Sequence, residues 1–215
     1  MDLELELKKL SQQKVTWKKY SAEGLDLDYS LIFNKQLASD IFLKLEDSIQ
    51  YYTGDLTKVK VFGKYHNIPR QQVAFGDEGV SYKFSGVTIP AKPWTPQLEF
   101  IRNYLEEITN YKYNFVLVNR YRNGSDHIGE HRDDEGELDP QTPIASLSLG
   151  QEREFVLKHA DARKKIRDIP KVKIVLQHGS LLLMNPPTNK FWYHSLPIRK
   201  SAPGARINLT FRKLL

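Results

Sequence analysis

The sequence predicts a mainly β (α+β) fold, with a double-stranded β-helix (jelly-roll) core and helices flanking it. Two observations indicate this class. Two amphipathic segments come first, and a series of short segments rich in β-branched and aromatic residues follows, separated by Gly, Pro or Asn. Two helices followed by many closely spaced strands are typical of a sheet sandwich whose helices pack on the outside.

Both predicted helices carry an apolar stripe and a start signal. The first begins after Asn34, which can act as its N-cap. Its stripe consists of Leu37, Ile41, Leu45 and Ile49. The second has Thr95 as N-cap and Pro96 in its first turn. Its stripe consists of Leu98, Ile101, Leu105 and Ile108. We therefore expect both helices to pack on a sheet through one face.

The predicted strands lie mostly in the C-terminal half. They are Phe115–Tyr121, Ile144–Leu149, Glu154–Lys158, Val172–Leu176, Ser180–Met184, Trp192–Leu196 and Ala205–Arg212. Residues 1–16, rich in Lys and Gln, predict a flexible, weakly helical N-terminal lead without a targeting segment. Residues 17–215 predict a single domain, within which 113–215 would form the jelly-roll core.

Composition limits the functional classes. The 215 residues are 40% hydrophobic and 27% charged, as in a globular protein, and the apolar runs are too short to span a membrane. The absence of cysteine excludes disulfides and thiolate metal sites. A net charge of +6 is compatible with a nucleic-acid partner but equally with an ordinary basic protein.

A candidate metal site consists of His131, Asp133 and His194. In an extended segment, residues two apart share a face, so the imidazole of His131 and the carboxylate of Asp133 can reach one ion. Two histidines and a carboxylate on one face of an octahedral ion leave positions open for a bidentate cosubstrate and O2, as in non-haem Fe(II) oxygenases. A lone His-x-Asp occurs often by chance, so the motif needs further support.

That support comes from the last predicted strand. Arg206, Asn208, Thr210 and Arg212 alternate with apolar residues and therefore share one face. On an edge strand this would be an ordinary solvated face. Guanidinium groups also bind carboxylates through paired, charge-assisted hydrogen bonds. Asn119 and Tyr121 form a second same-face pair upstream of the His-x-Asp motif. Together these residues indicate a pocket for an anionic cosubstrate beside the metal.

In order and spacing, these motifs resemble the AlkB-type Fe(II)/2-oxoglutarate dioxygenases, and the likeness covers most of the chain. It is strongest toward the nuclear branch of that family, which acts on duplex DNA. The segments that carry it include VFGKYHNIPRQ (Val61–Gln71), YKFSG (Tyr82–Gly86), FVLVNRYRNGSDHIGEHRDDE (Phe115–Glu135), HGSLLLMN (His178–Asn185), WYHSLP (Trp192–Pro197) and RINLTFRK (Arg206–Lys213).

The resemblance implies Fe(II), 2-oxoglutarate and O2 as cofactor and cosubstrates. The metal ligands, which are also the catalytic residues, would be His131, Asp133 and His194. The residues that hold 2-oxoglutarate would be Asn119, Tyr121, Arg206, Asn208, Thr210 and Arg212. The reaction implied is oxidative removal of N-alkyl groups from lesions such as 1-methyladenine and 3-methylcytosine, releasing formaldehyde, succinate and CO2.

The resemblance also implies a nucleotide-recognition lid over about residues 55–90 and a set of substrate contacts. Phe84 would stack on the flipped base opposite His131, and Phe62 would fill the gap that the base leaves in the duplex. The full set is Phe62, Gly63, Lys64, Arg70, Tyr82, Lys83, Phe84, Asp134 and Glu135. The expected partner is double-stranded DNA, with single-stranded DNA as a further one. We expect a nuclear monomer without membrane attachment, and residues 1–16 contain no convincing sliding-clamp motif.

Two alternatives stay open at this point. A single-strand DNA or RNA demethylase would use the same chemistry without a duplex wedge at Phe62. A non-catalytic basic nucleic-acid-binding module would need neither iron nor the arginine-bearing strand.

Overall fold

The computed structural model describes residues 3–61, 64–84 and 87–215. Its helices are α1 (Leu3–Ser11), α2 (Lys35–Ser48), the 3-10 turn η1 (Gly54–Thr57), α3 (Pro96–Thr109), α4 (Ala160–Arg163) and α5 (Thr188–Phe191). Its strands are β1 (Lys18–Ala22), β2 (Leu25–Leu31), β3 (Lys58–Val61), β4 (Lys64–Asn67), β5 (Gln71–Gly76), β6 (Ser81–Phe84), β7 (Val87–Pro90), β8 (Lys92–Pro93), β9 (Phe115–Tyr121), β10 (Ile128–His131), β11 (Ile144–Gly150), β12 (Arg153–His159), β13 (Val172–Leu176), β14 (Ser180–Met184), β15 (Trp192–Leu196) and β16 (Arg206–Arg212).

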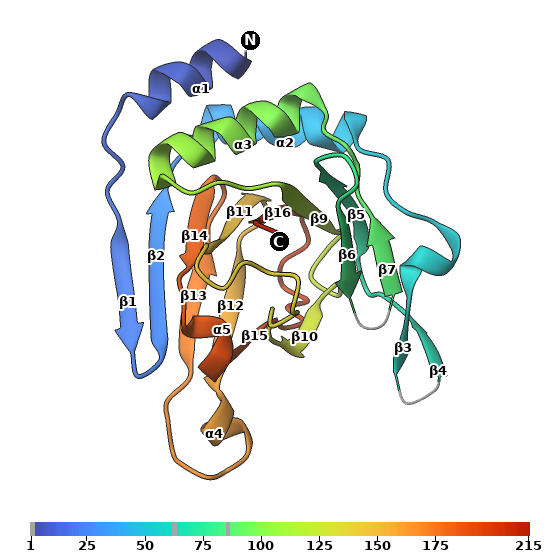
Figure 1. Cartoon of the computed structure of the whole chain (residues 1–215), viewed down its shortest axis with the longest axis vertical. Coiled ribbons are helices and arrows are strands. Elements are labelled where there is room, and N and C mark those ends of the chain that lie inside the picture. The colour runs from blue at the N-terminus through green and yellow to red at the C-terminus, as the bar shows by residue number, and fades with distance from the viewer. Residues whose placement is uncertain (1–2, 62–63, 85–86) are drawn as a thin grey trace.

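Two sheets, antiparallel except for the edge pair of β5 and β8, form the core (Figure 1). The large sheet has eight strands in the order β1-β2-β14-β11-β16-β9-β5-β8, and the small sheet has four in the order β10-β15-β12-β13. Two hairpins, β3–β4 and β6–β7, lie beside the large sheet. The predicted mainly β class with flanking helices is confirmed. Among the described residues, no helix is both long and apolar enough to cross a membrane.

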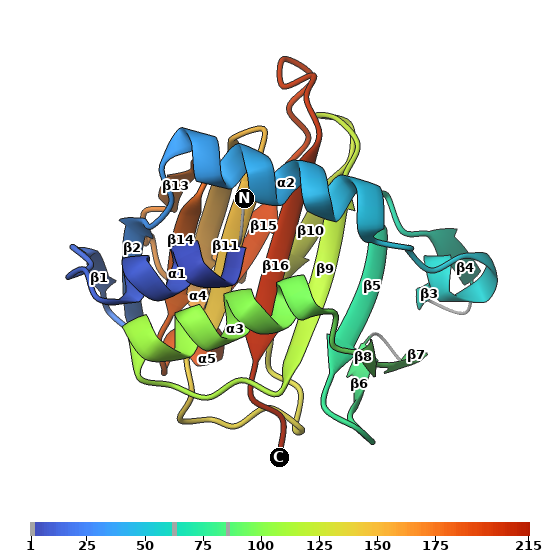
Figure 2. The same ribbon diagram turned by 90° about the horizontal axis from the view of Figure 1, so that it is seen from above.

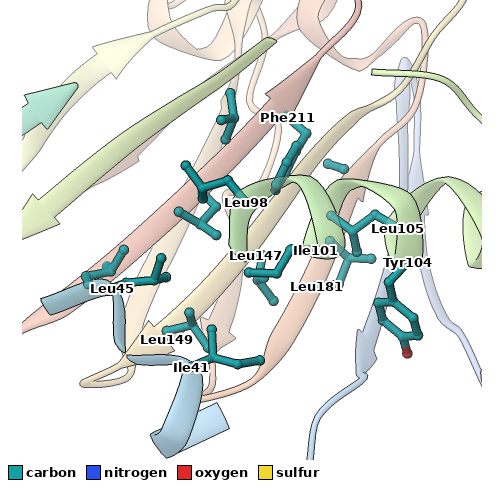
Figure 3. Packing of buried hydrophobic residues seen from close by; sticks show 14 of the residues in the cluster. Ile41, Leu45, Leu98, Ile101, Tyr104, Leu105, Leu147, Leu149, Leu181 and Phe211 are labelled. Carbon is teal, nitrogen blue, oxygen red and sulfur yellow. The ribbon is translucent and has the colours of Figure 1, made fainter. Parts of the chain in front are cut away.

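Helices α2 and α3 cover the outer face of the large sheet, with α1 beside α3 (Figure 2). Their stripes join buried residues of β11, β14 and β16, as Figure 3 shows for Ile41 of α2, Ile101 of α3 and Phe211 of β16. The predicted caps are present, since Asn34 accepts a hydrogen bond from the Leu37 amide and Thr95 from the Leu98 amide. Because these stripes cover the outer face of the large sheet, any functional site on this sheet must lie on its inner face, toward the small sheet.

The predicted N-terminal lead contains a short helix. Leu3–Ser11 form the helix α1, and Leu3 and Leu7 are buried in the cluster beneath the helices. These leucines are one helical turn apart and so reach the same neighbours. The hairpin of β1 and β2, which extends the large sheet at one edge, was also not predicted. Strand β1 has no buried face, and sequence patterns detect such strands poorly.

The last strand lies in the interior of the sheet. β16 pairs with β11 on one side and β9 on the other, and all seven of its residues are buried. Ile207, Leu209 and Phe211 belong to the cluster beneath the helices. The alternating polar residues therefore face the space between the two sheets. This excludes the alternative of a solvated edge strand.

Candidate active site

His131, Asp133 and His194 meet at one end of the small sheet. His131 ends β10 and pairs in register with His194 of β15, while Asp133 lies in the loop that follows β10. Ligand atoms from all three lie within 4.8 Å of one another. The two imidazole rings are 4.2 Å apart between centroids, in an edge-to-face arrangement. Antiparallel pairing thus brings together ligands that are distant in sequence.

Hydrogen bonds orient two of the three side chains. Nδ1 of His131 lies 2.9 Å from the Gly129 carbonyl oxygen, to which it must donate, so Nε2 keeps its lone pair. That Nε2 lies 3.7 Å from Oδ1 of Asp133. The other oxygen, Oδ2, accepts a 2.9 Å hydrogen bond from Arg212. One carboxylate oxygen and one imidazole nitrogen are therefore turned toward the same point.

Electrostatics favour the metal-binding protonation state of Asp133 and of His194. Burial alone would raise the pKa of Asp133, but Arg212, His194 and His131 hold it well below its ordinary value. Burial, together with the nearby His131, lowers the pKa of His194 to about 3. At neutral pH the site therefore presents a carboxylate and a neutral imidazole, the forms that bind a divalent cation.

A polar layer on β16 adjoins the triad. Arg206 donates to Oγ of Ser148 at 2.9 Å, and Asn208 donates to Oγ of Ser146 at the same distance. Thr210 donates to Oδ1 of Asn208 at 3.0 Å. The predicted residues Asn119 and Tyr121 lie opposite Asn208 and Arg206 on β9. The structure therefore brings all six predicted cosubstrate residues to one inner face, including Arg212 at the end nearest the triad.

Arg206 and Arg212 occupy different ends of this layer. Arg212 is committed to Asp133, whereas the guanidinium of Arg206 lies 5.2 Å from the centroid of the Tyr121 ring. Nε of each arginine is buried without a hydrogen-bond partner among the described residues, but only Arg206 lacks a carboxylate partner there. Burial lowers the pKa of Arg206 to about 10, so the group stays protonated at neutral pH. A buried cation with an unused donor is suited to a carboxylate ligand.

A cavity of about 50 Å³ lies between the sheets and connects the triad with the polar layer of β16. Its lining includes the triad, the four polar residues of β16, Asn119, Tyr121 and Arg70. An adjoining cavity of about 230 Å³ begins at Asp133 and extends past Asp134 and Glu135. The triad thus stands between a polar cavity and a second, larger one.

The predicted substrate residues are placed differently from one another. Tyr82 is fully buried, with the Arg212 guanidinium 5.2 Å from its ring centroid. Glu135 is partly buried, and burial together with the charge of Asp133 raises its pKa. Asp134 is half exposed and accepts a hydrogen bond from Arg132 at 2.6 Å. Lys64 lies exposed on β4.

Arg70 lies at an unexpected position for a substrate contact. Its side chain is buried, and Nε donates to Oδ1 of Asn119 at 2.7 Å. By its position, Arg70 therefore belongs with the residues around the proposed cosubstrate site. Phe62 and Gly63, and the side chains of Lys83 and Phe84, lie outside the residues that the structure describes.

Three polar residues of the cavity region are not predicted from the sequence. Ser146 and Ser148 support Asn208 and Arg206 from β11, and their spacing of two within the predicted strand was an available signal. Arg153 begins β12 and is only 2% exposed. A charged residue next to a predicted strand gives no comparable signal.

Comparison with known proteins agrees with this geometry. The family model described as the 2OG-Fe(II) oxygenase superfamily matches residues 29–212, which include every residue of the triad and of the polar layer. The chain belongs to this superfamily. Members use Fe(II), 2-oxoglutarate and O2, so this 2OG-Fe(II) oxygenase is an enzyme with those requirements.

Individual relatives lie close in sequence. The chain is 55% identical to the mouse DNA oxidative demethylase ALKBH2, over 93% of this chain and 84% of the relative. It is 53% identical to the human ALKBH2, over 93% and 77%. A solved structure, that of OsALKBH1, superposes with a TM-score of 0.59 at 19% identity, over 92% of this chain and 100% of the other. At 19% identity this likeness shows a shared fold only.

The residues present fit the two groups that the family implies. Two imidazoles and a carboxylate form the donor set that non-haem Fe(II) oxygenases use. The buried guanidinium of Arg206, with its free donor, fits a carboxylate at the other end of the same cavity. The arrangement can therefore hold a metal and a dicarboxylate side by side.

Proposed function

We propose that this oxygenase removes N-alkyl groups oxidatively from bases in double-stranded DNA. One observation carries the proposal: three vertebrate relatives named DNA oxidative demethylases are 52–55% identical to this chain over at least 93% of it. This similarity extends over most of the chain and supports a shared activity as well as a shared fold. The substrates proposed are lesions of the 1-methyladenine and 3-methylcytosine type.

Each part of the site then has a role. When bound, Fe(II) with 2-oxoglutarate and O2 supplies the oxidation of the N-alkyl carbon, with succinate, CO2 and formaldehyde as products. His131, Asp133 and His194 would hold the metal. Arg206, with Asn119 and Tyr121, would hold the distal carboxylate of 2-oxoglutarate, because Arg212 is already committed to Asp133.

The remaining polar residues position these groups. Asn208 and Thr210 are hydrogen-bonded to each other, and Asn208 is also fixed by Ser146. Such fixed partners keep the polar layer in place before the cosubstrate arrives. In this proposal Tyr82 and Glu135 would contact a base brought to the metal; Glu135 lines the larger cavity beside Asp133, whereas Tyr82 is buried against Arg212.

Duplex substrate requires a flipped base, because the alkyl carbon cannot reach a buried metal while the base stays stacked. The hairpin β3–β4, which carries the exposed Lys64, stands beside the sheet and can approach a phosphate backbone (Figure 1). Phe62, between these strands in sequence, is our proposed wedge. Lesions that block pairing and add charge should flip at lower cost than normal bases.

The central test is anaerobic reconstitution with Fe(II) and 2-oxoglutarate, followed by O2 and a duplex with one 1-methyladenine. We expect formaldehyde and succinate in equal amounts. An unmethylated duplex serves as control and should give no formaldehyde. Succinate without formaldehyde on either duplex would contradict the DNA substrate while leaving the oxygenase chemistry intact.

The duplex preference has its own test, the variant Phe62→Ala. We expect it to lose most repair of duplex DNA while repair of a single strand with the same lesion is largely kept. Equal losses on both substrates would contradict the wedge.

We further propose that the enzyme acts in the nucleus, as a monomer and without a membrane. Residues 17–215 would form the catalytic domain, with the lid at about 55–90 and the jelly-roll core at 113–215. A sliding-clamp partner is not part of this proposal. Fractionation of cells and size-exclusion chromatography of the purified chain test these points.

A further inference from the structure

Arg153 is a buried arginine on the inner face of the small sheet. It begins β12, where burial alternates, and shares its face with Phe155 and Leu157. Its side chain is almost wholly enclosed. No carboxylate among the described residues lies within ion-pair distance of it, and burial lowers its pKa. A buried charge without a counterion is costly unless its donors are used.

The two terminal nitrogens bind backbone carbonyls from two loops, whereas Nε has no hydrogen-bond partner among the described residues. One nitrogen donates to Asn123, and the other donates to Asp126 at 3.0 Å and to Pro197 at 2.7 Å. Asn123 and Asp126 lie in the loop that leads into β10, and Pro197 directly follows β15. A single guanidinium therefore joins the beginning of one ligand-bearing strand to the end of the other.

The two loops are also packed tightly against each other. The Arg199 amide donates to the Gly124 carbonyl at 2.8 Å, and a Cβ atom at Gly124 would collide with the Arg199 backbone. Movement of one loop would therefore displace the other. Because β10 ends at His131 and β15 contains His194, this junction lies at the far end of the strand pair from the metal.

Arg153 also lies near a residue of the proposed cosubstrate site. Its guanidinium lies 6.0 Å from the centroid of the Tyr121 ring, while that of Arg206 lies 5.2 Å from the same ring. Tyr121 is paired with Arg206 across β9 and β16. Two arginines therefore lie near this ring, of which only Arg206 lines the cavity.

We infer that Arg153 is a positioning residue for 2-oxoglutarate binding. It fixes the Tyr121 ring against Arg206 and fastens the loops that lead into β10 and out of β15. It acts through Tyr121 and the two loops, and does not contact the cosubstrate. The inference depends on the family's use of 2-oxoglutarate and not on DNA as the substrate.

The test is the dissociation constant of 2-oxoglutarate, measured by calorimetry on the full chain loaded with Mn²⁺, which needs no turnover. We expect Arg153→Met to weaken binding about tenfold or more, as loss of a supporting residue around a metal site commonly does. Arg153→Lys keeps the charge but lacks the planar fork, and we expect it to bind as weakly as R153M. Recovery of wild-type affinity in R153K would show that charge alone matters and would overturn positioning.

A matched control is Arg102→Met on α3. Arg102 also donates to several oxygens and lies over an aromatic ring, with its guanidinium 4.7 Å from the Trp94 centroid, but it is remote from the cavity. We expect R102M to lose thermal stability without a change in 2-oxoglutarate affinity. If R153K and R102M are destabilised alike and both bind 2-oxoglutarate normally, Arg153 is only structural.

A double-mutant cycle with Tyr121→Leu tests the route of action. If Arg153 acts through Tyr121, R153K should weaken 2-oxoglutarate binding far less in the Y121L background than in the wild type. Fully additive losses would contradict the route. Because none of these measurements uses DNA, they stand or fall independently of the demethylase assay.

Discussion

Arg212 and Asp133 form a buried ion pair at the metal site, with 2.9 Å between Nη2 and Oδ2 and with side chains 5% and 4% exposed. The pair leaves the second carboxylate oxygen of Asp133 directed toward His131. Because Arg212 is paired with Asp133, only Arg206 remains without a carboxylate partner at the other end of the cavity. The pair therefore prepares Asp133 to bind through one oxygen.

Replacing Arg212 with Met should destabilise the metal-free protein by about 3–5 kcal/mol, because it leaves the Asp133 carboxylate buried and unpaired. Saturating Mn²⁺ or Fe(II) should restore part of that loss, since the ion supplies positive charge to the same carboxylate. Urea unfolding with and without metal measures both effects. A loss that metal does not reduce would contradict the proposed coordination by Asp133.

Replacing Arg206 with Met should weaken 2-oxoglutarate binding by about 2–5 kcal/mol, the usual result of removing one partner from a buried charged hydrogen bond. The affinity of Mn²⁺ alone should change little, because Arg206 is not among the three ligand residues. Separate calorimetric titrations with Mn²⁺ and with 2-oxoglutarate measure the two affinities. Equal weakening of metal and cosubstrate would place Arg206 at the metal instead.

Sequence patterns predicted much of this site because its residues lie on strands with strict alternation. The polar and apolar residues of β16 separate onto the two faces as expected, and β15 places His194 opposite His131. Alternation alone could not distinguish Arg206 from Arg212, since they share a face. Only the position of Asp133 beside the end of β16 assigns them different partners.

Other features depend on pairing between distant segments. Arg70 precedes β5, and its side chain reaches Asn119 because β5 pairs with β9. Arg153 lies on a buried face where the usual rule expects an apolar residue, so its place could not be read from composition. Both positions follow from the order of strands in the sheets, which one sequence does not specify.

Asp126 should make stability depend on acidic pH. It is buried, and its hydrogen bonds with the side chain and amide of Arg122 outweigh burial and lower its pKa below the value of 3.8 for an unperturbed group. Its contribution is therefore fully present above that pKa and is lost as pH falls through the lower, folded-state pKa. Asp126→Asn should lower Tm at pH 7, and its difference from wild type should shrink below about pH 4.

Asp55→Asn is the matched control for this measurement, because the Asp55 side chain is 99% exposed. We expect it to follow the wild-type Tm at every pH. A D126N deficit of constant size from pH 7 to pH 3 would contradict the assigned role of the carboxylate charge.

Lys64 should contribute to DNA affinity through charge alone. It is exposed on β4, in the hairpin that projects beside the sheet (Figure 1). If it contacts a phosphate, Lys64→Ala should weaken binding to all duplexes alike, and the slope of log K against log salt should fall in magnitude by about one. Fluorescence anisotropy over a salt series, with methylated and unmethylated duplexes, provides the slope.

The control variant is Lys8→Ala, on α1 at the opposite side of the large sheet, which should change neither DNA affinity nor slope. If K64A lowered affinity only for the methylated duplex, Lys64 would be reading the lesion and not the backbone.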